Sequence, residues 1–157
     1  MKNNEYKNKS IVKIYFKDLR INMDLYNKKL FIFDLDGTLV DTAPDFKNSL
    51  NYMLTEINEE TIELDEIRNL VGYGARELIR RTAESKGIQH DDKKINDMLK
   101  IFLLHYTHNI DDDSVLFENV ENVLLYLKEK NIKLAVCTNK MEKLSNLLLD
   151  KLGVLNL

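Results

Sequence analysis

The sequence of 157 residues contains one cysteine and no long hydrophobic run, and these shortages exclude several classes of protein. Because Cys137 has no second cysteine to pair with, an internal disulfide and a thiolate zinc site are excluded. The sequence therefore favours a reducing compartment, and we expect a cytoplasmic protein. No apolar stretch approaches the about 18 residues that a membrane-spanning helix needs, so we expect no membrane association.

The sequence also lacks an excess of basic residues, because it contains 23 Lys and Arg residues and 26 Asp and Glu residues. Nucleic-acid-binding modules need a basic surplus to displace counterions, so we expect no nucleic-acid partner. The first 22 residues are an exception, with six basic and two acidic residues. They lack the apolar core and the small-residue cleavage site of a signal peptide. We predict that residues 1–28 form a loose N-terminal extension without chemistry.

The strongest signal along the chain is the apolar run of residues 30–35, which predicts a strand buried on both faces of a parallel sheet. Asp34 and Asp36 lie where this strand ends, and Gly37 follows them. Ligands of open α/β sheets bind at the carboxyl ends of the strands, and a glycine turn allows both carboxylates to converge there. Such hard oxygen ligands suit Mg²⁺. An acid pair that serves only a turn or a helix cap is the alternative.

The string FIFDLDGTLVDT at residues 31–42 resembles the first motif of the haloacid dehalogenase superfamily. Phosphatases of that superfamily carry Asp-x-Asp-Gly-Thr at the end of a buried strand, and an acid at Asp36 is typical of its phosphatases and mutases. The resemblance implies that Asp34 is the nucleophile that forms an aspartyl-phosphate and that Asp36 is the general acid and base. It also implies that Asp34 and Asp36, the latter through its backbone carbonyl, hold Mg²⁺.

A second apolar run, residues 132–137, predicts another strand, which is followed by Thr138, Asn139 and Lys140. A hydroxyl and an amide at a strand end can donate hydrogen bonds to phosphate oxygens, although a plain loop or helix cap is the alternative. In the superfamily, Thr138 matches the serine or threonine of the second motif, which clamps the phosphate. The resemblance therefore implies that Thr138, Asn139 and Lys140 bind substrate.

Between and after the two motifs, apolar residues recur at helical spacing, and no strand is predicted from residue 43 to about residue 113. The resemblance implies a helical cap there. We therefore predict an α/β fold with a truncated, Rossmann-like parallel sheet core (residues 29–42 and 114–157) and a helical cap inserted after the first strand (residues 43–113). The helical stripes lie within residues 46–57, 78–83, 95–106, 118–130 and 141–152.

Within the predicted cap, residues 71–76 contain a glycine pair and resemble the segment that phosphoglycolate-phosphatase-like members present to their active site. A turn between two helices is the alternative for this segment. Arg76 is a candidate for substrate binding, because a guanidinium can pair bidentately with a carboxylate or a phosphate. An ion pair on the protein surface is the alternative role for Arg76.

The resemblance covers residues 30–157 and only two of the four motifs of the superfamily. The lysine of the third motif and the acidic loop of the fourth are not found, and 18 residues follow Asn139. We therefore expect the N-terminal part of a phosphatase, with an open sheet edge beside the first strand. We therefore also expect this chain alone to have low or no phosphatase activity.

Two functions follow from these features. The first is a Mg²⁺-dependent phosphate monoester hydrolase of the phosphoglycolate phosphatase type, whose partner is a small-molecule phosphate monoester. The alternative is a non-catalytic remnant that binds a phosphate compound or associates with a complementing C-terminal chain or with itself through the open sheet edge. A metal-dependent sugar transferase with an Asp-x-Asp pair is disfavoured, because it does not explain Gly37, Thr38 or Thr138.

Overall fold

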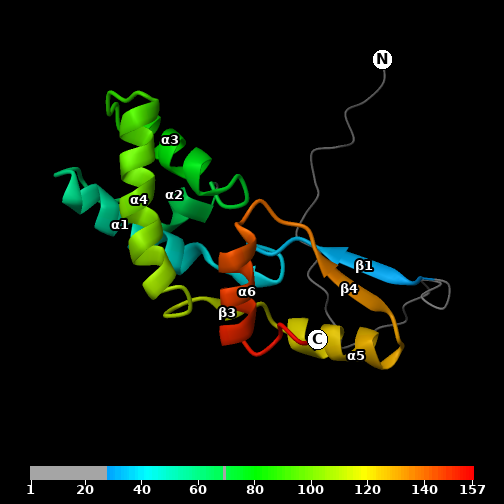
Figure 1. Ribbon diagram of the computed structural model, residues 1–157. Helices are drawn as coiled ribbons and strands as arrows, with labels where there is room; N and C mark the ends of the chain where they lie inside the picture. Colours follow the sequence, from blue (N-terminus) through cyan, green and yellow to red (C-terminus); the bar gives the residue numbers. More distant parts are fainter. Residues whose placement is uncertain (1–27, 69) are drawn as a thin grey trace, which may run out of the picture.

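The structure is a computed structural model, and it describes residues 28–68 and 70–157. In Figure 1, helices α1 to α4 form one lobe, strands β1 and β4 lie with α5 in the other, and α6 lies between them. The predicted extension lies outside the described residues, apart from Lys28. The elements are β1 (Leu30–Phe33), β2 (Val40–Asp41), α1 (Ala43–Glu56), α2 (Leu64–Arg68), α3 (Ala75–Ser85), α4 (Asp92–His108), β3 (Val115–Leu116), α5 (Val120–Glu129), β4 (Lys133–Val136) and α6 (Glu142–Lys151).

Strands β1 and β4 pair in parallel, and they form a sheet of two strands within the described residues. Phe33 lies opposite Val136, and the backbone amide of Cys137 donates to the carbonyl of Phe33 over 2.8 Å. The predicted α/β class with a parallel sheet is therefore confirmed. Because parallel strands end at the same sheet edge, Asp34 and Thr138 emerge side by side.

The prediction that the first strand is buried on both faces is wrong. Phe31 and Phe33 face α5 and pack against the cluster that contains Val123 and Leu127. The side chains of Leu30 and Ile32 alternate to the opposite face, where they are 47% and 60% exposed. A continuous apolar run is compatible with a strand covered on one face or on two, and only one layer covers this strand within the described residues.

Helices α1 to α4 lie within residues 43–113, the range predicted for the cap, and that range contains no strand among its described residues. Helix α1 packs along α4 through a buried core that includes Phe46, Leu50 and Phe102. Asp91 is the N-cap residue of α4, and its carboxylate accepts the backbone amide of Lys94 over 2.7 Å. Local periodicity thus accounts for the positions of the long cap helices, and a side-chain cap also fixes the start of α4.

Two short strands at the base of the cap, β2 and β3, were not predicted. They pair antiparallel, with Val40 opposite Leu116, so the chain enters and leaves the cap through adjacent segments. Helix α2 was not predicted either. Elements of two to five residues are too short to show a hydrophobic period, which explains why the pattern did not reveal them.

Asp45 in the first turn of α1 fixes the segment by which the chain leaves the cap. Its carboxylate is buried and accepts the backbone amides of Asp113 over 2.9 Å and Ser114 over 2.8 Å. A buried backbone amide that loses its acceptor is costly, so this carboxylate stabilises the junction between cap and sheet. None of the helices that the structure describes is long and apolar enough to cross a membrane.

Replacement of Asp45 by alanine is expected to lower the free energy of unfolding by about 1–3 kcal/mol, because the buried amide of Ser114 and the partly buried amide of Asp113 lose their acceptor. Urea unfolding measures this change. Asp112→Ala is the matched control, because Asp112 is an exposed acid beside the same segment, and it should change stability by less than about 0.5 kcal/mol. Equal stability of the two variants would contradict the role of Asp45.

Candidate active site

The two acids of the first motif lie in different surroundings. Asp34 directly follows β1 and is exposed, and its Oδ1 accepts the backbone amide of Leu35 over 2.8 Å. At Gly37 the backbone adopts a φ of 78°, which favours glycine, and the Gly37 amide donates to the carbonyl of Val40 over 2.8 Å. This tight turn carries the Asp36 side chain beneath the cap, where it is buried.

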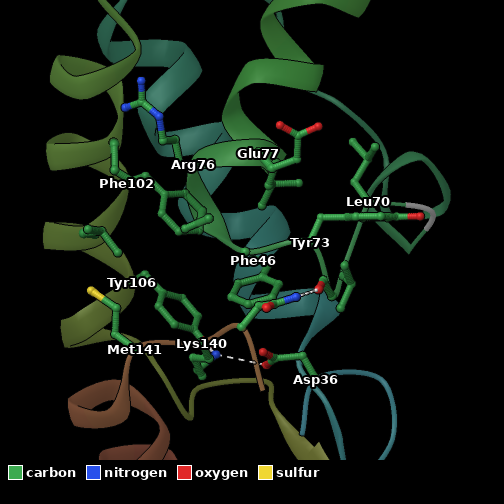
Figure 2. Close-up of a pocket in the computed structure, with 18 of the residues that line it drawn as sticks. Asp36, Phe46, Leu70, Tyr73, Arg76, Glu77, Phe102, Tyr106, Lys140 and Met141 are labelled. Carbon is green, nitrogen blue, oxygen red and sulfur yellow. Dashed lines mark hydrogen bonds and ion pairs between the residues drawn. The ribbon is translucent and has the colours of Figure 1, made fainter. Parts of the chain in front are cut away.

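Asp36 forms a buried ion pair with Lys140, which follows β4. The Lys140 Nζ lies 2.9 Å from Asp36 Oδ1, and the two side chains are only 4% and 7% exposed. The same Nζ donates to the hydroxyl of Tyr106 over 2.6 Å and lies 4.5 Å from the ring centroid of Phe46. Figure 2 shows this group at the bottom of a cavity, with the cap helices above it.

Burial changes the protonation equilibria of this group. Burial lowers the pKa of Lys140 below its ordinary value, while the neighbouring Asp36 carboxylate opposes that shift. Burial also raises the pKa of the Tyr106 hydroxyl, which therefore stays protonated. The hydroxyl oxygen accepts from Lys140, and α4 of the cap is thereby linked to the sheet end.

The other residues of the second motif contact the core and the cap. Thr138 Oγ1 accepts the backbone amide of Lys140 over 3.2 Å. Asn139 Nδ2 donates to the carbonyl of Gly72 over 2.8 Å, so it holds the predicted glycine turn over the sheet end. Gly74 also lies against Asn139. The substrate-binding roles of Thr138, Asn139 and Lys140 stay predictions.

Arg76 lies at the upper rim of the cavity rather than beside Asp36, as Figure 2 shows. Its guanidinium forms an ion pair with Asp92 of α4 over 2.6 Å and donates to the side chain of Asn96. The alternative weighed from the sequence, an ion pair at the protein surface, describes this arrangement. A contact between Arg76 and a substrate stays a prediction.

A cavity of about 530 Å³ lies between the cap and the sheet end, with Asp36, Asn139 and Lys140 among its lining residues. Asp34 and Thr138 are not among them, so the cavity begins at Asp36 and extends into the cap. Most of its wall is apolar or aromatic, and the residues that contribute to it include Phe46, Leu70, Leu99, Phe102, Tyr106 and Met141.

Phe46 and Tyr106 were recognised in the sequence only as members of helical apolar stripes. Both face the Lys140 ammonium group, whose Nζ lies 4.6 Å from the ring centroid of Tyr106. An aromatic residue at an apolar position of a helix carries no sequence signal that distinguishes a core ring from a ring beside a charged group. The role of Asp45 is equally hidden in the sequence. An acid in the first turn of a helix is common, and nothing in the sequence indicates that this one accepts amides from a distant segment.

The acids at the sheet end fit a divalent cation in part. Within the described residues, no three His, Cys, Asp or Glu side chains are grouped to hold a metal ion. Asp34 offers an exposed carboxylate, a hard oxygen ligand of the kind that Mg²⁺ prefers. The Asp36 carboxylate is engaged by Lys140. Asp34 is therefore the side chain that would hold Mg²⁺, and water or substrate oxygens would complete the coordination.

Fold and site together define an α/β protein with two acids at one end of a parallel sheet and a helical cap above them. The family model described as haloacid dehalogenase-like hydrolase matches residues 31–157. The chain therefore belongs to this family, in agreement with the resemblance of its first motif.

The relatives that match this chain support the same assignment. A phosphoglycolate phosphatase of Colwellia psychrerythraea is 40% identical to this chain. The matched region covers 86% of this chain and 61% of the length of the Colwellia protein. One of Caulobacter vibrioides is also 40% identical, over 82% of this chain and 54% of its own length. The chain thus spans little more than half the length of these curated relatives.

Solved structures share the fold. A crystal structure described as that of a predicted phosphoglycolate phosphatase, from Haemophilus somnus, has a TM-score of 0.73 and 28% identity. The match covers 81% of this chain and 58% of the Haemophilus somnus chain. A structure from Lactobacillus delbrueckii subsp. bulgaricus has a TM-score of 0.74 over 80% of this chain and 61% of its own. At 23% identity, the latter supports the fold alone.

Lys140→Met is expected to destabilise the protein by about 3–5 kcal/mol, because it leaves the Asp36 carboxylate buried and unpaired. Urea unfolding measures this loss. The double variant Asp36→Asn/Lys140→Met removes both charges and should recover most of the stability.

Lys100→Met is the matched control for this prediction. Lys100 pairs with Asp97 at the surface, where the two side chains are 76% and 55% exposed. Its removal should change stability by less than about 1 kcal/mol. A Lys140→Met variant no less stable than Lys100→Met would show that the buried pair does not stabilise the junction.

Proposed function

We propose that this chain provides the nucleophile-bearing part of a Mg²⁺-dependent phosphate monoester hydrolase of the phosphoglycolate phosphatase type. The observation that carries the proposal is the convergence of Asp34 and Thr138 at one sheet end, with the buried Asp36 beside them under the cap. The names of the relatives that match the chain support the substrate class.

In this proposal, Asp34 attacks phosphorus in line, and the bond between phosphorus and the alcohol oxygen breaks to give an aspartyl-phosphate. Asp36, in its protonated form, gives its proton to the leaving alkoxide, and the water that hydrolyses the intermediate then returns a proton to the Asp36 carboxylate. The Thr138 hydroxyl donates to a phosphate oxygen. Asp34 would also hold Mg²⁺, which when bound would offset the negative charge of the phosphoryl group. The cap excludes bulk water from the site.

The activity of residues 1–157 alone is expected to be low. Phosphoryl transfer depends on groups that neutralise developing charge, and the loss of one such group costs on the order of 10²- to 10³-fold in rate. The lysine and the acidic loop that the third and fourth motifs supply in the superfamily are not found in this sequence. The rival is a non-catalytic remnant that associates with a complementing chain. The cytoplasmic location also stays a prediction.

The test is release of phosphate by the 157-residue protein with Mg²⁺ and a panel of monoesters that includes phosphoglycolate. The phosphoglycolate phosphatase of Colwellia psychrerythraea serves as the reference enzyme. We expect turnover at least about 10²-fold below the reference, abolished by Asp34→Asn and unchanged by Asp112→Asn.

Three results would argue against parts of the proposal. Turnover equal to that of the reference would show that the site is complete. Turnover that survives Asp34→Asn would remove Asp34 as the nucleophile. The absence of phosphate release from every monoester would favour the non-catalytic remnant.

A further inference from the structure

We propose that two copies of this chain pair through the outer edge of β1, the edge that faces away from β4. The two β1 strands run antiparallel about a two-fold axis, in a register that places Asp34 opposite Lys28 of the partner subunit. The two small sheets then join into one sheet with the strand order β4, β1, β1, β4. The surface is a strand edge, and its partner is a second copy of the same edge.

The outer edge of β1 has no strand partner within the described residues. The carbonyls of Lys29 and Phe33 accept backbone amides from β4 and the residue after it, over 3.0 Å and 2.8 Å. Because backbone groups alternate in direction along a strand, those of Leu30 and Ile32 point away from β4. Such a row of outward-pointing donors and acceptors is a template for another strand.

The side chains of this edge do not protect it against pairing. Leu30 and Ile32 are 47% and 60% exposed, on the face of β1 opposite the cluster that packs against α5. Proteins commonly protect an edge strand with charged residues or proline, and β1 contains neither between Lys29 and Asp34. The edge is therefore suited to pairing with another strand.

The backbone geometry restricts how two copies of this edge can pair. In an antiparallel pair, residues that exchange hydrogen bonds must both direct their backbone groups toward the partner strand. In this strand those residues are Leu30 and Ile32, and continuation of the strand adds Lys28 and Asp34. A two-fold axis at Phe31 places Leu30 opposite Ile32 of the partner subunit. The same axis places Lys28 opposite Asp34 of the partner subunit.

The neighbouring registers lose both kinds of complementary contact. An axis at Ile32 places Leu30 opposite Asp34 of the partner subunit. An axis at Leu30 places Ile32 opposite Lys28 of the partner subunit. In each case an apolar side chain faces a charged one. Apolar pairs and opposite charges directly across two strands stabilise their pairing, so the axis at Phe31 is the favoured register.

This register brings a cation of one copy to the sheet end of the other. Asp34 and Lys28 are both exposed, so their side chains are free to meet across the two strands. Lys140 at the same sheet end is engaged by Asp36. In the proposed reaction Asp34 receives the phosphoryl group, so the dimer places a positive charge where negative charge accumulates. This consequence rests on the proposed function, whereas the pairing of the strands does not.

Analytical ultracentrifugation of the 157-residue protein over a range of concentrations tests the pairing without any need for turnover. Two short strands form a small interface, so we expect a reversible dimer. The average mass should rise with concentration from 18.4 kDa toward twice that value. A mass that stays at 18.4 kDa at every concentration would overturn the proposal.

Reversal of one charge tests the register. Lys28→Glu faces Asp34 of the partner subunit with a like charge, and the two-fold axis repeats this repulsion. The Kd of the dimer should rise at least about 10-fold. Lys29→Glu is the matched control, because it makes the same change of charge at the next exposed residue, whose carbonyl faces β4. An equal rise of Kd in both variants would overturn the register.

Exchange of the two charges should restore the dimer. The double variant Lys28→Glu/Asp34→Lys recreates both ion pairs in the same register, and its Kd should return to within about 3-fold of the wild-type value. Circular dichroism checks that each variant folds. A folded double variant that dimerises no better than Lys28→Glu would show that these residues are not opposite each other.

A charge on the apolar part of the edge separates strand pairing from association elsewhere on the molecule. Ile32→Lys places a cation beside Leu30 of the partner subunit and should raise the Kd of the dimer at least about 10-fold. Leu104→Lys makes the same change at a side chain of α4 that is 65% exposed, and it should leave the Kd unchanged. The reverse pattern would assign the association to the cap and overturn the proposal.

Should the double variant fail to fold, NMR of the wild-type protein decides the register. In a mixture of isotope-labelled and unlabelled protein, filtered nuclear Overhauser spectra detect contacts between subunits only. We expect a contact between the methyl groups of Leu30 and those of Ile32 of the partner subunit. Its absence at concentrations where the dimer predominates would overturn the proposed register.

Discussion

The buried ion pair between Asp36 and Lys140 is the interaction on which the rest of the site depends. It joins the segment after β1 to the segment after β4, and the contacts of Lys140 with Tyr106 and Phe46 extend it to α4 and α1. Because a buried charge without a partner is strongly destabilising, neither acid nor base can be removed alone without loss of stability. The sheet end and the cap are thereby held against each other at the cavity.

The same pair separates the roles of the two acids of the motif. Asp34 is exposed and close to Thr138, which suits a nucleophile or a metal ligand, whereas Asp36 is buried against the cap. One acid is thus open to solvent at the sheet end, and the other lines the cavity under the cap. Membership of the haloacid dehalogenase-like hydrolase family supports the reaction class proposed above.

The sequence predicted those parts of the fold that depend on local pattern. The apolar runs before Asp34 and Thr138 became β1 and β4, and the helical stripes became the long helices α1, α3, α4, α5 and α6. The sequence also indicated a parallel sheet, and strands paired in parallel place both motifs at one edge. These features follow from the spacing of side chains along the chain, which the sequence states directly.

By itself, the sequence therefore determined the α/β class, the positions of β1, β4 and the long helices, and the family of this protein, whereas the tertiary structure decided which groups meet. Lys140 lies 104 positions from Asp36, and Asp45 lies 68 positions from Asp113, so no local pattern links either pair. The exposure of one face of β1 and the pairing of Arg76 with Asp92 also depend on what packs nearby. Periodicity specifies which face of an element is apolar, but the partner of a polar side chain is fixed only when distant segments fold together.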